Sequence, residues 1–156
     1  MIRTSTTLLA VAILAALPAD AREQAKKSES FVKVDVKASK IENEKQVVTL
    51  TLIIEKEWHI YANPVGQENL ATATEVTISG KTNPQTVKIS YPRGKLEKNH
   101  VVGDHYIYEG KVVIKADVQR VKGDTGPLKA TIKLQACSSG ESGTCLSPAT
   151  VEVNIP

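Results

Sequence analysis

The stretch QVVTLTLIIE, residues 46–55, decides the fold class of this chain. Its apolar side chains recur at every second position, which is the period of a β-strand. Val48, Leu50, Leu52 and Ile54 therefore share one face of an extended strand. A strand with one continuous apolar face is stable only when a second apolar layer covers that face. The stretch predicts a buried strand in a layered β protein.

The same alternation recurs through most of the chain, whereas no segment shows apolar residues at helical spacing. Gly, Pro, Asn and Asp separate the alternating segments, as turns between strands require. Several short strands in one chain of this length are typical of two sheets packed face to face. We therefore predict an all-β, two-sheet sandwich, whose further strands cover residues 32–36, 76–78, 87–91, 112–118, 128–134 and 151–155.

The first residues are typical of a secretory signal peptide. Arg3 supplies a positive start, residues 8–17 are apolar and uncharged, and Ala19–Ala21 form a small-x-small cleavage pattern. About ten apolar residues are too few to span a bilayer, which takes roughly 20. We expect residues 1–21 to be removed near Ala21, 22–30 to be a flexible lead-in and 31–156 to be one domain, periplasmic or secreted.

Charge and motifs exclude several classes of function. The chain has 20 Lys and Arg against 17 Asp and Glu, a net charge of +3, and the two signs alternate along the sequence. No basic stripe with interleaved aromatic residues is present, so we expect no nucleic-acid partner. No second apolar segment reaches membrane length, so we expect no stable membrane insertion. The sequence shows no nucleophile elbow, no phosphate-binding glycine loop and no zinc-type cysteine spacing, so we expect no metal and no cofactor.

Cys137 and Cys145 are the only two cysteines, and the Ser/Gly-rich loop SSGESGT separates them. Continuing the alternation from Leu134 and Ala136, which point inward, predicts that Cys137 points outward. The pair then brackets a hairpin loop, with at least one sulfur near the surface. Two interpretations follow. A structural disulfide across so short a ring contributes about 2.5 kcal/mol, and accessible sulfurs in a flexible loop also suit thiol-disulfide exchange. Spacing alone favours the structural disulfide.

Four further segments occur in an order that is typical of one family. They are EWHIYANP (57–64), ISYPRGK (89–95), GDHYIYEGKVVI (103–114) and LQACSSGESGTCLSPATVEV (134–153). Together they resemble the N-terminal periplasmic domain of the thiol:disulfide interchange protein DsbD, over about residues 31–155. The resemblance implies an immunoglobulin-like sandwich that carries a redox-active cysteine pair on an inserted hairpin.

The resemblance also implies an electron relay and assigns its residues. Cys145 matches the cysteine that forms mixed disulfides with partners, and Cys137 matches the resolving cysteine. His59 and Tyr61 match positions where the family presents rings beside the cysteines. A cap loop that covers the pair corresponds to Asn99, His100, Val101, Val102 and Gly103. The implied partners are thioredoxin-like proteins, disulfide isomerases or cytochrome-maturation proteins, and if active the domain is a protein thiol-disulfide oxidoreductase.

The sequence also departs from the family pattern. The loop between the cysteines is about two residues longer than usual, Val101 and Val102 stand where an aromatic cap residue is common, and Ser147 replaces one of two prolines. Because the chain ends at Pro156, we expect the electron donor to be a separate membrane-linked protein. The alternative is a non-catalytic secreted binding or scaffold module with the same fold and a structural disulfide.

The remaining aromatic residues and histidines have ordinary interpretations. Trp58, Tyr106 and Tyr108 are predicted to pack in or beside the core. His100 and His105 are predicted to be surface histidines.

Overall fold

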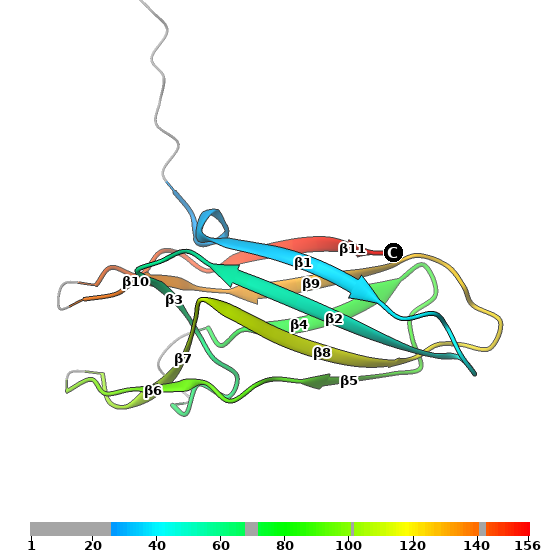
Figure 1. The fold of residues 1–156 in the computed structure, drawn as a ribbon, viewed down its shortest axis with the longest axis horizontal. Helices are drawn as coiled ribbons and strands as arrows, with labels where there is room; N and C mark the ends of the chain where they lie inside the picture. Colours follow the sequence, from blue (N-terminus) through cyan, green and yellow to red (C-terminus); the bar gives the residue numbers. More distant parts are fainter. Residues whose placement is uncertain (1–25, 68–71, 101, 141–142) are drawn as a thin grey trace, which may run out of the picture.

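The computed structural model describes residues 26–67, 72–100, 102–140 and 143–156. Within these residues the chain forms one short 3₁₀ helix and eleven strands (Figure 1). The elements are η1 (Ser28–Phe31), β1 (Val32–Ala38), β2 (Lys45–Ile54), β3 (Trp58–Tyr61), β4 (Glu75–Gly80), β5 (Thr86–Ser90), β6 (Lys95–Glu97), β7 (His105–Glu109), β8 (Lys111–Gln119), β9 (Leu128–Leu134), β10 (Ala136–Ser138) and β11 (Ala149–Ile155).

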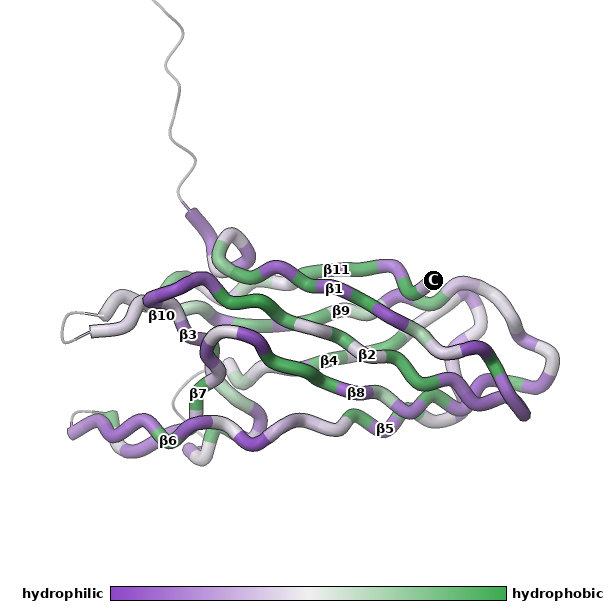
Figure 2. Tube along the Cα trace, viewed as in Figure 1, coloured by the Kyte–Doolittle hydropathy of each residue, from purple (hydrophilic) through white to green (hydrophobic). Residues whose placement is uncertain are grey.

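Two antiparallel sheets face each other and enclose the core. The first has the order β1-β2-β8-β5 and the second the order β11-β9-β4. Alternate residues of these strands point inward, and the alternation is visible along β2 and β8 in Figure 2. Leu50, Ile114 and Ile132 are fully buried between the sheets. The predicted all-β sandwich and its seven strands are confirmed.

A third sheet, with the order β10-β3-β7-β6, extends from one end of the sandwich. Its strands are not among those predicted from the sequence. Each is nevertheless the chain neighbour of a sandwich strand: β3 follows β2, β6 follows β5, β7 precedes β8 and β10 follows β9. The turn from β7 to β8 occurs at Gly110, whose φ of 61° favours glycine. The main chain of Ile54 also donates a hydrogen bond to the Gly110 carbonyl, at 2.8 Å. The small sheet is thus held by the strands that form the core.

The folded part of the described chain begins before the expected boundary at residue 31. Ser28 starts η1 and is fully buried. Its hydroxyl donates to the Ser147 carbonyl at 2.6 Å and accepts from the Ala136 amide at 3.0 Å. This side chain therefore ties together the two arms of the cysteine hairpin, and the end of the expected lead-in belongs to the fold.

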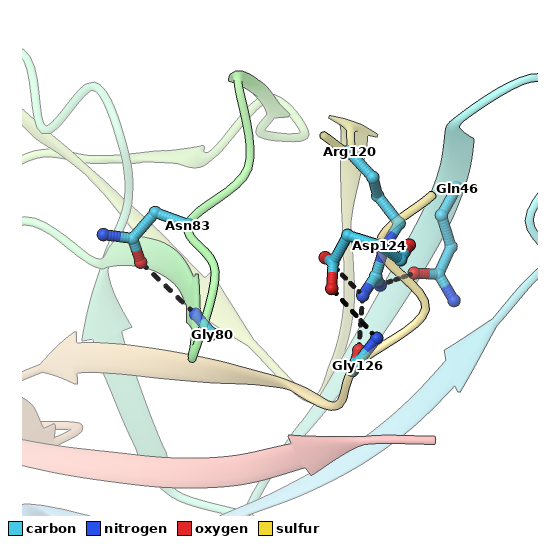
Figure 3. Close-up of polar contacts among 6 residues, drawn as sticks. All are labelled: Gln46, Gly80, Asn83, Arg120, Asp124 and Gly126. Atoms are coloured by element: carbon cyan, nitrogen blue, oxygen red, sulfur yellow. Dashed lines mark hydrogen bonds and ion pairs between the residues drawn. The ribbon is translucent and has the colours of Figure 1, made fainter. Parts of the chain in front are cut away.

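A buried arginine closes the other end of the sandwich (Figure 3). Arg120 is 3% exposed, and its guanidinium donates to the side chains of Gln46 at 2.8 Å and Asp124 at 3.0 Å. It also donates to the carbonyls of Asp124 and Gly126. These partners satisfy a charge that would otherwise be costly to bury.

Within the described ranges, no helix is both long enough and apolar enough to cross a membrane.

Candidate redox site

The two cysteines form a disulfide at the base of a hairpin beside the small sheet. Their sulfurs lie 2.05 Å apart, and the two residues pair across the hairpin as an antiparallel bridge. Above the disulfide, the Ser138 amide donates to the Thr144 carbonyl at 3.0 Å, and the Thr144 amide donates to the Ser138 hydroxyl at 2.9 Å. A side chain at Gly143 would approach the Ser138 carbonyl to 2.5 Å, so the tight turn favours glycine there. The predicted hairpin is confirmed.

The two sulfur-bearing residues differ in exposure. Cys145 is exposed, which agrees with the prediction that at least one sulfur lies near the surface. Cys137 points away from the main core, as predicted, but it is only 2% exposed because a second apolar cluster covers it. The alternation continues through Gln135, where the chain leaves β9 and enters β10 in another sheet, because Leu134 and Ala136 both pack in the main core. Ala136 then packs in the main core, whereas Cys137 packs in a second apolar cluster with Tyr61, Val65 and Ile107.

One face of the small sheet forms the floor of a cleft of about 420 Å³ beside the disulfide. Strand register explains why its residues meet, because Cys137 pairs with His59 and His59 pairs with Glu109. Two residues further along the same face, Tyr61 pairs with Ile107, and Ile107 pairs with Lys95. Two residues beyond that, His105 pairs with Glu97. Directly paired residues project to the same side of a sheet. The register thus gathers residues from four strands on one surface.

Tyr61 lies against the exposed cysteine. Its hydroxyl is 3.6 Å from the Cys145 sulfur. Burial raises the pKa of Tyr61 above 10.0, so the phenol keeps its proton near neutral pH. The disulfide sulfur has no hydrogen, and the hydroxyl is therefore the donor in this contact. The same donor is in place to stabilise a Cys145 thiolate after reduction.

His59 lies on the cleft floor among charged groups. Burial lowers its pKa below 6.5, although the negative charges of Glu109 and Glu97 raise it in part. His59 is thus mainly neutral at pH 7. Lys95 forms an ion pair with Glu109 at 2.8 Å, and this contact raises the pKa of Lys95. The resulting mix of two carboxylates, one ammonium and a neutral imidazole was not predicted, because these residues are far apart in sequence.

The loop between β6 and β7 borders the cleft opposite the cysteines. Asn99 and Val102 line the cleft, and the Asn99 side chain accepts a hydrogen bond from the Val102 amide at 3.0 Å. His100 is exposed and is not among the lining residues. Val101 lies outside the described residues. Because Cys145 remains exposed, the described part of this loop does not cover it.

His105 contacts the main chain of this loop. It is 4% exposed, so the prediction of a surface histidine is wrong for this residue. Its Nδ1 lies 2.9 Å from the Gly103 carbonyl, which can only accept, so Nδ1 carries the proton in this contact. The His105 ring also packs on the Tyr61 ring, with centroids 5.6 Å apart. A continuous set of contacts therefore links the loop to the exposed sulfur through Gly103, His105 and Tyr61.

The other aromatic residues have packing roles, as predicted. Trp58 stacks on Phe31 with ring centroids 3.6 Å apart. Tyr108 is buried, and its hydroxyl bridges the main chain of Asn63 and Pro92. Tyr106 packs against the same core. In the described part of the chain, no three His, Cys, Asp or Glu side chains gather as a metal site requires.

Comparisons with known proteins agree with this geometry. Residues 28–156 match the family described as "Thiol:disulfide interchange protein DsbD, N-terminal". The reduced N-terminal domain of DsbD from Neisseria meningitidis has a similar fold, with a TM-score of 0.53 and 15% identity over 88% of this chain and 93% of that chain. The N-terminal periplasmic domain of ScsB from Proteus mirabilis also has a TM-score of 0.53, with 18% identity over 78% of this chain and 44% of that chain.

At these identities the structural likeness concerns the fold alone, and no curated protein sequence matches the chain. The family match covers every strand described above, together with both cysteines. This chain is therefore a member of the family of DsbD N-terminal domains.

Proposed function

We propose that this protein is an exported thiol-disulfide exchange domain that relays electrons through Cys137 and Cys145. The observation that carries the proposal is the asymmetry of the disulfide. Cys145 is exposed at an open cleft, and Cys137 lies beneath it, 2% exposed. A partner's sulfur can therefore approach one end of the S–S bond, while the other end stays sheltered. Family membership supports the same chemistry.

Reduction of the domain begins when a donor thiolate attacks the Cys145 sulfur. A mixed disulfide forms and Cys137 leaves as a thiolate, which takes up a proton. The donor's second thiolate then attacks the donor's first sulfur, which is bonded to Cys145 in the mixed disulfide, and Cys145 is released as a thiolate. Two electrons and one proton have then entered the domain, Cys145 is left as a thiolate, and the donor has become a disulfide. Tyr61 stabilises the Cys145 thiolate by donating a hydrogen bond from its hydroxyl to the sulfur.

The reverse sequence passes the electrons on. The Cys145 thiolate attacks an acceptor disulfide, and Cys137 then attacks Cys145 in the mixed disulfide. The acceptor leaves as a dithiol, and the domain returns to the oxidised state described here. Because Cys137 is buried beside Cys145, the resolving sulfur can react with the Cys145 sulfur but not with the sulfur of another protein. This geometry suits a relay in which every mixed disulfide is short-lived.

The partners proposed are thioredoxin-like redox proteins, disulfide isomerases or cytochrome-maturation proteins, with a separate membrane-linked donor. Such proteins expose their own reactive sulfur and require an accessible sulfur in return. Export through the signal-like residues 1–21, with cleavage near Ala21, would place the chain in the periplasm, where disulfides form and persist. Residues 1–25 lie outside the described structure, so cleavage is tested by determining the N-terminus of the exported protein.

Trapping tests the exchange itself. Cys137→Ser leaves Cys145 without its resolving partner and is expected to accumulate a mixed disulfide with a thioredoxin-like protein. Cys145→Ser is the matched control, because the remaining sulfur is buried and should trap little. Mass spectrometry of the non-reduced complex identifies the linked cysteine. Trapping through Cys137 at an equal rate would contradict the proposed roles.

The second candidate is a non-catalytic binding or scaffold module with a structural disulfide. The packing of Cys137 in an apolar cluster favours it, since burial protects a disulfide from reduction. Equilibration with glutathione separates the two functions. A reduction potential below about −300 mV would mark a structural bond and contradict the relay.

A further inference from the structure

The outer face of the first sheet carries a concentration of lysines. Strand register places their side chains in rows across β1, β2, β8 and β5. One row contains Lys33, Ile53 and Lys111, and another contains Lys37, Thr49 and Lys115. The full set of charged residues on this face is Lys33, Asp35, Lys37, Lys45, Lys88, Lys111, Lys115 and Asp117, all of them exposed.

This face and the opposite face of the sandwich differ in charge. Six lysines and two aspartates give the outer face of the first sheet a net charge of +4. The outer face of the second sheet carries Lys129 and Lys133 against Glu75 and Glu152, a net charge of zero. The charges alternate along the sequence, but the strand period sorts them in space. The net charge of this one face, +4, is thus larger than the net charge of the full sequence, +3.

The lysines of this face form no ion pair among the described residues, and only Lys88 has a carboxylate residue, Asp117, directly opposite it in the strand register. The ion pairs in that part of the chain join Lys95 to Glu109, Arg120 to Asp124 and Lys129 to Glu152. Two of these three pairs lie away from both outer faces, and the third lies on the neutral one. The positive charge of the first sheet is thus available to a partner.

The residue type narrows the class of that partner. All six cations are lysines, which act as mobile point charges, whereas arginine is preferred where planar, bidentate recognition of a single group is needed. Exposed apolar side chains are interspersed among them, since Val47, Ile53 and Val113 are each about 40% exposed. Lysines that surround apolar side chains suit a diffuse anionic surface with an apolar layer beneath it.

We propose that this outer face binds an anionic phospholipid bilayer. The face extends over four strands and up to ten residues, which is about 15 by 30 Å. Several headgroups fit beneath such an area at once. Each lysine near an anionic membrane surface strengthens binding by about fivefold, and the attraction falls with ionic strength.

Binding in this way leaves the cleft open. The cysteine hairpin belongs to the small sheet at one end of the sandwich, and the lysine face follows its long side (Figure 1). A domain that lies on a bilayer through the first sheet therefore presents Cys145 along the membrane surface. The inference does not depend on the exchange chemistry, because none of its residues lines the cleft.

Vesicle co-sedimentation tests the proposal. The probes are vesicles of phosphatidylcholine alone and vesicles of equimolar phosphatidylcholine and phosphatidylglycerol. Lys37→Gln with Lys115→Gln removes two charges from the lysine face, and Lys129→Gln with Lys133→Gln removes two from the neutral face. The net charge of the two double variants is equal, so only the location of the charge differs.

We expect the native protein to bind the phosphatidylglycerol vesicles at low salt and not the phosphatidylcholine vesicles. The lysine-face variant should bind about twentyfold more weakly, and the neutral-face variant within about twofold of the native protein. Equal weakening of both variants would overturn the proposal, because only net charge would then matter. Failure of the native protein to bind, or equal binding to both kinds of vesicle, would also overturn it. Circular dichroism and the reduction potential, measured on each variant, confirm that the fold and the cysteines are unchanged.

Discussion

Reduction of the disulfide should leave this protein folded. The perturbation is the reduction of Cys137–Cys145 by a phosphine at constant pH, without any substitution. A relay domain has to keep its structure in both redox states, whereas a structural disulfide contributes a large part of a domain's stability. An unfolded reduced state would therefore exclude the relay.

The size of the effect follows from the length of the closed ring. The cysteines are 8 residues apart, and cross-linking so short a loop lowers the unfolded-state entropy by an amount worth about 2.5 kcal/mol. Hydrogen bonds of the hairpin remain after reduction, including that from the Leu146 amide to the Ala136 carbonyl at 2.9 Å. Buried Cys137 remains a small apolar side chain. Domains are stable by about 5–15 kcal/mol, so the reduced protein should stay folded.

Urea denaturation of the oxidised and reduced protein measures the difference directly. We expect it to be about 2.5 kcal/mol, with equal dependence on urea concentration in both states. Cys137→Ala with Cys145→Ala is the matched control and should resemble the reduced protein within about 1 kcal/mol. Unfolding of the reduced protein at 25 °C without urea would refute the reasoning and favour a structural disulfide.

Three further predictions concern single residues. Tyr61→Phe removes the hydroxyl that donates to the Cys145 sulfur. Alkylation of Cys145 in the reduced protein near neutral pH should therefore slow by about fivefold. An unchanged rate would contradict a hydrogen bond between Tyr61 and Cys145. Because burial lowers the pKa of His59 below 6.5, the unfolded chain binds a proton that the folded protein does not. Its stability should therefore decrease from about pH 7 to pH 5, and His59→Gln should reduce this dependence in urea denaturation. Arg120→Met leaves the buried Gln46 and the Asp124 carboxylate without their partner, so it should lower the free energy of unfolding by about 3 kcal/mol, while exposed Lys88→Met should change it by less than about 0.5 kcal/mol.

The sandwich could be predicted because its strands are long and half-buried. In β8 every second residue from Val112 to Val118 is buried, so the period of two is visible in the sequence. The strands of the small sheet are three to five residues long and lack this pattern. In β3, for example, Trp58 and His59 are half-buried while Ile60 and Tyr61 are both buried. Because Ile60 packs in the main core and Tyr61 in the second apolar cluster, both faces of β3 are buried and no alternation of polar and apolar residues results.

The site could be predicted only in part for the same reason. The family segments pointed to Cys145, His59 and Tyr61, and these three residues lie together at the cleft. The burial of Cys137 was missed, since it depends on packing against Tyr61, Val65 and Ile107, which are far from it in the sequence. Glu97 and Glu109 were also missed, because only the pairing of β6 with β7 and of β7 with β3 brings them near His59.

The direction of β11 has a practical consequence for attaching this protein to a support. The strand begins at Ala149, paired with Leu134 near the hairpin, and runs away to Ile155, paired with Leu128. A linker fused after Pro156 would thus leave the sandwich at a distance from the cysteines. Coupling the domain to an electrode or a bead through that linker should orient the disulfide toward the solution, where a soluble redox protein can reach it.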